Sequence, residues 1–99
     1  MSRYVINVLA SQDLNDIGNY FAENNIEAGE RFFQAYDRKC KQLVAFPGSG
    51  KRYPEVHPDI RGLLLENHIL LYKILYDGIE ILRIVNGRRD LLSLFEELN

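Results

Sequence analysis

Four arginines in the second half of the chain are the side chains best suited to bind another molecule. One of them stands inside a largely apolar run, residues 79–85, and the other three lie in neighbouring segments. A guanidinium group is always charged and presents five donors in a plane that matches a carboxylate or a phosphate. The candidate target-binding residues are therefore Arg61, Arg83, Arg88 and Arg89.

The position of Arg83 within its run predicts the direction of its side chain. Residues 79–85 are expected to form a strand, in which successive side chains point to opposite faces. Arg83 would then share a face with Ile81 and Val85. Glu80 would point to the other face, so we expect no ion pair between Glu80 and Arg83. Two interpretations stay open: Arg83 is a plain half-exposed arginine, or it faces a partner or a phosphate.

The spacing of the other reactive side chains assigns no catalytic or metal site. His57 and His68 are eleven residues apart, in a predicted loop and a predicted turn, and we expect both to be exposed to solvent. The lone cysteine, Cys40, falls on the apolar stripe of a predicted helix, where a small buried hydrophobic residue is expected. No zinc-ligand spacing and no Ser-His-Asp or Cys-His arrangement is present. We therefore predict no catalytic residues, no metal and no cofactor.

Composition limits the class of protein and its partners. The net charge is −2 and the pI is near 5.6, which argues against nucleic-acid binding as the main activity, because neutralising phosphates needs a surplus of Lys and Arg on one face. No apolar run approaches the ~20 residues of a membrane helix. One cysteine cannot form an internal disulfide, so we expect a cytoplasmic protein without a membrane partner.

The first half of the chain predicts a strand and two helices. Aromatic and β-branched residues over Arg3–Leu9 indicate a strand. Ser11 is the expected N-cap of a helix that continues to about Glu23, with Asp13 at its positive end. A second helix is expected from about Glu27 to Ala45. Because only two or three residues separate the helices, they should form an antiparallel pair.

The second half predicts a loop and a run of strands. Residues 47–60 hold all three prolines and form the loop, and strands follow over 61–65, 69–75 and 79–85. The Asp77-Gly78 pair predicts a tight hairpin turn whose two central residues have positive φ. Residues 88–98 are expected to be a short helix or tail. The whole chain, residues 1–99, is thus predicted to be one α+β domain with the order β-α-α-β-β-β, a helical hairpin packed on one face of a small, mostly antiparallel sheet.

An ordered series of residues along this chain resembles the RelE/ParE superfamily of bacterial toxins, most closely its ParE branch of plasmid-stabilisation proteins. The series runs from the first predicted helix nearly to the end of the chain. Each motif is short, and the order of the whole series carries the resemblance. Its members are Asp13-Leu14, Ile17, Tyr20, Arg31-Phe32, Phe46-Pro47, Gly50, Arg52, Pro58 to Arg61, Tyr72, Ile79 to Ile84, and Gly87-Arg88-Arg89-Asp90.

The resemblance implies a toxin of a type II toxin–antitoxin pair. Its expected partner is a ParD-like antitoxin whose tail wraps the toxin in a hetero-oligomeric complex. ParE members inhibit DNA gyrase by trapping it on cleaved DNA, whereas RelE members cut messenger RNA in the ribosome. The resemblance therefore implies a gyrase inhibitor, with a RelE-like endonuclease or an inactive homologue that only binds antitoxin as alternatives.

Three features favour the ParE branch. A ribonuclease needs a base and an acid around the scissile phosphate, besides cations such as Arg61 and Arg89. Where RelE-type sites have a C-terminal tyrosine, this chain has Phe95, which cannot titrate and falls on an apolar stripe with Leu91. His68 lies at a predicted turn and does not replace that tyrosine. The acidic chain also suits ribosomal RNA poorly, so we predict a protein that binds its target and is not an enzyme.

Overall fold

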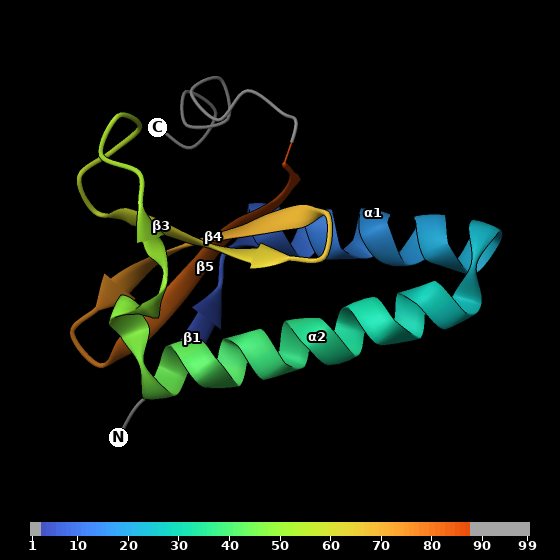
Figure 1. Ribbon diagram of the computed structural model, residues 1–99, viewed down its shortest axis with the longest axis horizontal. Helices are drawn as coiled ribbons and strands as arrows, with labels where there is room; N and C mark the ends of the chain where they lie inside the picture. The colour runs from blue at the N-terminus through green and yellow to red at the C-terminus, as the bar shows by residue number, and fades with distance from the viewer. Residues whose placement is uncertain (1–2, 88–99) are drawn as a thin grey trace.

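Five strands form one sheet, and two helices lie along one of its faces (Figure 1). The computed structural model describes residues 3–87, so the helix or tail predicted over residues 88–98 lies outside the described residues. The elements follow one another as β1 (Arg3–Ile6), α1 (Val8–Asn24), α2 (Ile26–Ala45), the 3-10 turn η1 (Pro47–Ser49), β2 (Lys51–Arg52), β3 (Ile60–Leu65), β4 (His68–Leu75) and β5 (Gly78–Asn86).

The predicted α+β class and order are confirmed. The strand order is β1-β5-β4-β3-β2; β1 runs parallel to β5 and the other neighbours are antiparallel. The segment 47–60 was predicted as a loop, and it contains the two short elements η1 and β2. Within the residues that the structure describes, neither helix has the length and apolar character that a membrane crossing requires.

Two asparagines set the boundaries of the helices. The backbone N–H of Asn7 donates to the carbonyl of Ile81, which continues the β1–β5 pairing, and its side-chain oxygen accepts from the N–H of Leu9 at 2.8 Å. One residue therefore ends the strand and caps α1, so the strand predicted to Leu9 is too long and Ser11 is wrong as the N-cap. Asn25 likewise caps α2, by accepting from the N–H of Ala28 at 3.0 Å.

Hydrophobic side chains cover both faces of the sheet. The larger cluster joins the helices to the face beneath them and includes Phe32, Leu43 and Tyr72. Cys40 is fully buried in this cluster, as predicted, and burial raises the pKa of its thiol. The smaller cluster covers the opposite face; its members are Ile60, Ile69, Leu71, Leu82 and Val85, with Tyr53 and Val56 packed on them. The segment after β2 thus closes the face that the helices leave open.

A bulge changes the alternation of side chains along β5. Leu71 pairs with Arg83, but the next residue, Tyr72, pairs with Ile81, so Leu82 is an extra residue on β5. As a result Ile81 joins the helix-facing cluster and Val85 the opposite one. The prediction that these two residues share a face is therefore wrong. An extra residue in one strand shifts every later side chain to the other face.

The turn between β4 and β5 differs from the predicted one. Its two residues are Tyr76 and Asp77, and neither has positive φ; in the described chain the non-glycine residue with positive φ is Glu66, at 56° in the β3–β4 turn. Gly78 is already the first residue of β5, opposite Arg3. A Cβ at Gly78 would overlap the carbonyl oxygen of Arg3. Glycine is therefore required by the close approach of β1, and not by the turn conformation.

Replacing Gly78 by alanine should weaken the pairing of β1 with β5. We expect Gly78→Ala to lower the free energy of unfolding by about 1–3 kcal/mol, because the backbone of Arg3 must move away. Urea denaturation measures the loss, and hydrogen exchange should show faster exchange at Asn7. Gly48→Ala is the matched control, since a Cβ there meets no atom within 4 Å. Equal losses in the two variants would contradict the steric explanation.

Candidate functional site

Arg83, the first of the candidate binding residues, is an internal residue. It is only 5% exposed, and its guanidinium pairs with the carboxylate of Asp13. Nε donates to Oδ2 at 2.8 Å and Nη2 donates to Oδ1 at 3.1 Å. The prediction that Arg83 binds a target is therefore wrong, because a buried guanidinium already held by a carboxylate cannot be presented at the surface.

The position of Asp13 explains why this pair exists. The β1–β5 pairing ends with Asn7 and Ile81, and no other strand of the described residues pairs with the following part of β5 on that side. There the Oδ2 atom of Asp13 accepts the backbone N–H of Ile84 at 3.0 Å. A buried N–H without an acceptor is costly. The carboxylate of Asp13 thus accepts the hydrogen bond that a neighbouring strand would otherwise accept. The sequence had suggested instead that this carboxylate stabilises the positive end of the helix.

Arg61 is the candidate residue that the structure presents at the surface. Its side chain is partly exposed, and Nη1 donates to the carbonyls of Gly48 and Gly50 at 3.3 and 3.0 Å. Two backbone acceptors on one nitrogen restrict the guanidinium to one position. Arg61 is therefore held in place before any partner arrives.

The segment that holds Arg61 is itself fixed by a buried tyrosine. The hydroxyl of Tyr72 donates to the carbonyl of Pro47 at 2.5 Å and accepts the N–H of Gly50 at 2.9 Å. Burial raises the pKa of Tyr72, which keeps this hydroxyl protonated and able to donate. A Cβ at Gly50 would lie only 2.5 Å from that hydroxyl, so glycine is needed here. Tyr72 and Arg61, opposite each other on β4 and β3, thus hold one loop between them.

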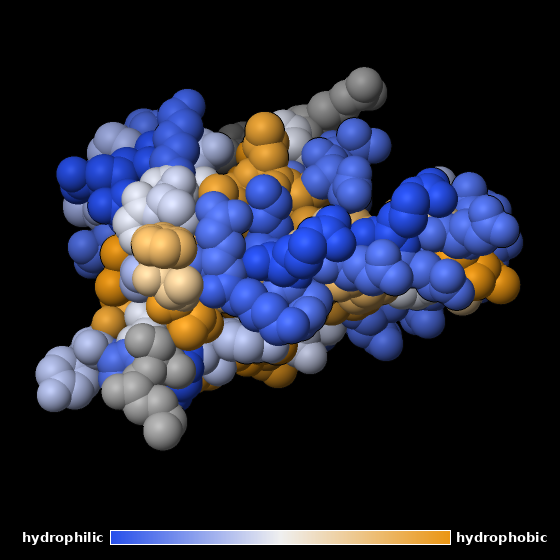
Figure 2. Space-filling model, turned by 60° about the horizontal axis from the view of Figure 1, so that its bottom comes forward, coloured by the Kyte–Doolittle hydropathy of each residue, from blue (hydrophilic) through white to orange (hydrophobic). Residues whose placement is uncertain are grey.

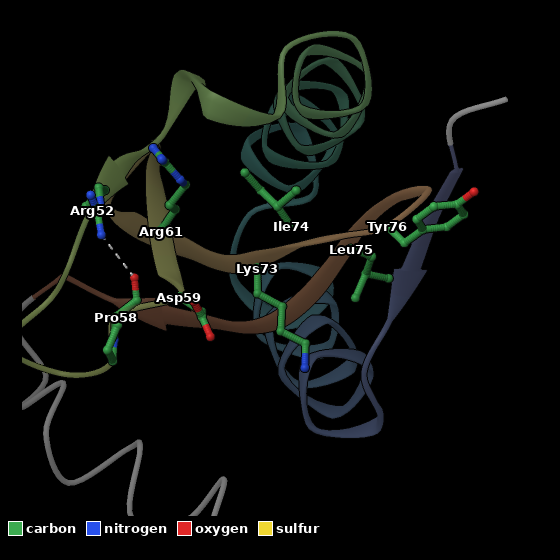
Figure 3. Close-up of a pocket in the computed structure, with 8 residues that line it drawn as sticks. All are labelled: Arg52, Pro58, Asp59, Arg61, Lys73, Ile74, Leu75 and Tyr76. Carbon is green, nitrogen blue, oxygen red and sulfur yellow. Dashed lines mark hydrogen bonds between the residues drawn. The ribbon is translucent and has the colours of Figure 1, made fainter.

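Arg61 borders an open hollow of about 570 Å³ at the end of the β3–β4 pair. Figure 3 shows Arg52 and Arg61 together on one side, Tyr76 on the far side, and Lys73 pointing away from both arginines. Nη2 of Arg52 donates to the carbonyl of Pro58 at 3.5 Å, and Nζ of Lys73 lies 3.5 Å from Glu80. The hollow is lined by Arg52, Pro58, Asp59, Arg61, Lys73, Ile74, Leu75 and Tyr76.

The predicted site is therefore divided. Arg61 lies at the hollow and Arg83 is buried elsewhere, while Arg88 and Arg89 lie outside the described residues. The sequence analysis did not select Arg52 and Lys73 as binding residues. Arg52 belongs to the resembling series, but only the strand register places it beside Arg61. Within residues 3–87, no three His, Cys, Asp or Glu side chains gather in a group that could hold a metal ion.

The two histidines differ in their surroundings. His57 is exposed, as predicted, and its Nδ1 accepts the N–H of Asp59 at 3.1 Å. The prediction for His68 is wrong: its ring packs edge-on against Phe32 with 5.2 Å between centroids, and its Nδ1 is buried with no hydrogen-bond partner among the described residues. Burial lowers the pKa of His68, against the opposing effect of Asp13.

Comparisons with known proteins agree with this architecture. The profile of a family described as "ParE toxin of type II toxin-antitoxin system, parDE" matches residues 4–91. The chain is also similar to a solved structure titled "Chromosomal ParDE TA system from P. aeruginosa". The TM-score is 0.72 and the identity 24%, over 87% of this chain and 96% of that chain. At this identity the structural match supports the fold. A search of curated proteins gave no match.

Breaking the Asp13–Arg83 pair should destabilise the protein strongly. We expect Asp13→Ala and Arg83→Ala each to lower the free energy of unfolding by about 3–5 kcal/mol, because the remaining charge stays buried without its partner. Equilibrium denaturation checks this. Asp16→Ala, at an exposed position of the same helix, should change stability by less than about 0.5 kcal/mol. Similar small losses in all three variants would show that the pair is not structural.

Stability should fall below neutral pH through His68. The pKa of His68 is lower in the folded protein than its value of about 6.5 in the unfolded chain, so the unfolded state binds the proton more readily. The stabilisation is complete above pH of about 6.5 and is lost as the pH falls through the lower, folded-state pKa. Denaturation between pH 7.5 and 5 measures the slope. His68→Phe should reduce that slope whatever its effect at pH 7.5; an unchanged slope would refute the assignment.

Proposed function

Because the chain belongs to the ParE toxin family and is a type II toxin of the ParE kind, we propose that it inhibits DNA gyrase in the cytoplasm. A ParD-like antitoxin neutralises it in a hetero-oligomeric complex. The toxin makes and breaks no bond itself; it acts by binding. Within the described chain, Arg61 is the polar centre of the target-binding surface; Arg88 and Arg89, which lie outside the described residues, are proposed to bind the target as well.

The placement of Arg61 carries this proposal. Its guanidinium is anchored on two carbonyls and borders an open hollow, so binding a partner requires little further ordering of this side chain. No carboxylate between residues 3 and 87 forms an ion pair with it. A fixed, charged and unneutralised arginine is typical of a recognition surface.

The groups around Arg61 support binding over catalysis. The residue opposite it, Tyr72, is buried, and its hydroxyl is engaged with Pro47 and Gly50. His68 is packed against Phe32 at the other end of the same strand. Neither side chain is placed to transfer a proton at the hollow. Proton transfer beside the scissile phosphate is what a ribonuclease would require.

The surface of the helical hairpin suits a partner that folds on binding. The outward face of α2 is largely hydrophilic, with hydrophobic side chains at its margins (Figure 2). Val8, Tyr20 and Ile26 are each more than 60% exposed on the two helices. A disordered segment gains affinity by covering such dispersed apolar residues over a large area. The ParDE title of the similar P. aeruginosa structure supports an antitoxin as the partner.

Loss of the Arg61 charge should reduce toxicity without unfolding the protein. Induced expression of the wild type is expected to arrest growth, and the purified chain to inhibit gyrase supercoiling while leaving message in a translating extract intact. Arg61→Gln should raise the concentration for half-inhibition at least about 10-fold, the loss of one charge-assisted contact. A thermal melt verifies the fold of the variant.

Arg38→Gln is the control, since Arg38 is exposed on α2 and does not line the hollow. It should inhibit gyrase as the wild type does. Cleaved message with normal supercoiling would replace this proposal by a RelE-like endonuclease. An intact message, normal supercoiling and normal growth would instead indicate an inactive homologue that binds antitoxin.

A further inference from the structure

Two arginines lie directly opposite each other where β2 pairs with β3. The register places Arg52 against Arg61, so their side chains leave the same face of adjacent strands. Like charges at this position are destabilising, whereas opposite charges are favourable. One charged pair of the same sheet follows the favourable rule: Lys73 on β4 lies opposite Glu80 on β5, with 3.5 Å between their charged atoms. The Arg52–Arg61 pair is an exception to this rule, and we expect it to lower the stability of the free protein.

The surroundings of this arginine pair hold it without neutralising it. Arg61 donates to the carbonyls of Gly48 and Gly50, and Arg52 donates to the carbonyl of Pro58. Asp59 also lines the hollow, but within residues 3–87 no carboxylate lies within 4.0 Å of a nitrogen of either arginine. The two side chains leave the same face of adjacent strands, and the hydrogen bonds to these carbonyls leave other guanidinium donors available to an anion that lies between them.

The neighbourhood of the pair distinguishes a polypeptide from a nucleic acid. The last pairing of β4 with β3 is Lys73 with Ile60, so among residues 3–87 no strand pairs with Ile74 and Leu75 on this side of β4. Ile74 is 46% exposed, and Tyr76 is fully exposed. An open strand end with apolar side chains suits an extended peptide. The net charge of −2 gives no general attraction for a phosphate backbone.

We propose that Arg52 and Arg61 form a carboxylate site that receives an acidic side chain from an extended segment of the antitoxin. This inference rests on the proposed function and specifies how neutralisation occurs. The acidic residue lies between the two guanidinium groups, and a neighbouring apolar residue packs on Ile74 and Tyr76. Because Arg61 also belongs to the target-binding surface, the antitoxin neutralises the toxin by occupying the same arginine.

Affinity measurements on single and double variants test the site. The antitoxin encoded beside the toxin gene is titrated into wild type, Arg52→Gln, Arg61→Gln and the double variant. Each single variant should bind about 10- to 100-fold more weakly, and the double variant little more weakly than either, because both arginines hold one carboxylate. Lys51→Gln is the matched control: Lys51 is the exposed neighbour of Arg52 on β2, its side chain leaves the other face of the strand, and it does not line the hollow, so this change should alter the affinity less than 3-fold.

The melting temperature of the free toxin separates a binding role from a structural one. Removing a like charge should leave the melting temperature of Arg52→Gln unchanged or raise it, while its affinity for antitoxin falls. A structural arginine would lower both quantities. A melting temperature that falls together with the affinity would therefore overturn the proposal, as would an affinity loss no larger than that of Lys51→Gln.

A single-stranded DNA of about 20 nucleotides serves as the competing ligand. Binding of this DNA that is lost in Arg52→Gln, with unchanged antitoxin affinity, would assign the site to nucleic acid and overturn the proposal. If wild type arrests growth and binds antitoxin but the arginine variants bind equally well, only this inference falls. If wild type neither arrests growth nor binds antitoxin, the proposed function falls with it.

Discussion

The carboxylate of Asp13 is the contact on which the arrangement of helices and sheet depends most. It accepts from Nε and Nη2 of Arg83 and from the backbone N–H of Ile84, so one side chain of α1 satisfies three donors of β5. The contact lies just where β1 no longer covers β5. Two charges out of water are tolerated only when their remaining donors and acceptors are satisfied. Because β1 ends early, the backbone N–H of Ile84 has no strand partner there among the described residues, and Asp13 of α1 supplies the acceptor.

A second hydrogen-bond network, in which side chains again bind backbone groups, lies at β3 and β4. Tyr72 and Arg61, paired on β4 and β3, bind the carbonyls and N–H of one short segment, residues 47–50. Tyr72 is buried and gives this segment its position, whereas Arg61 is partly exposed and lines the hollow. The same hydrogen bonds that close the loop over the core therefore fix the arginine at the hollow. The hydrogen bonds from Arg61 to Gly48 and Gly50 therefore both stabilise the loop and hold the charged group at the hollow.

Local sequence predicted the elements well but not the details of their contacts. Apolar periodicity identified both helices and the three long strands, because burial of one face imposes the period on the sequence. It missed β2, whose two residues are too few to show a period. The Asp77-Gly78 pair predicted the wrong role for Gly78, and strict alternation predicted the wrong faces for β5. The clash at Gly78 is with Arg3, far away in the chain, and the bulge at Leu82 becomes visible only when β5 is aligned with β4.

The sequence by itself determined that this chain is a helical hairpin on a small sheet, and the ordered residues resembling ParE toxins indicated its family. It could not distinguish Arg61 from Arg83, since both are arginines in largely apolar strands. Only the tertiary structure decided that Arg83 is buried against Asp13 and that Arg61 lies opposite Arg52 beside open solvent. The physical reason is that a guanidinium acts through the groups nearest to it, and those groups come from elements distant in the chain.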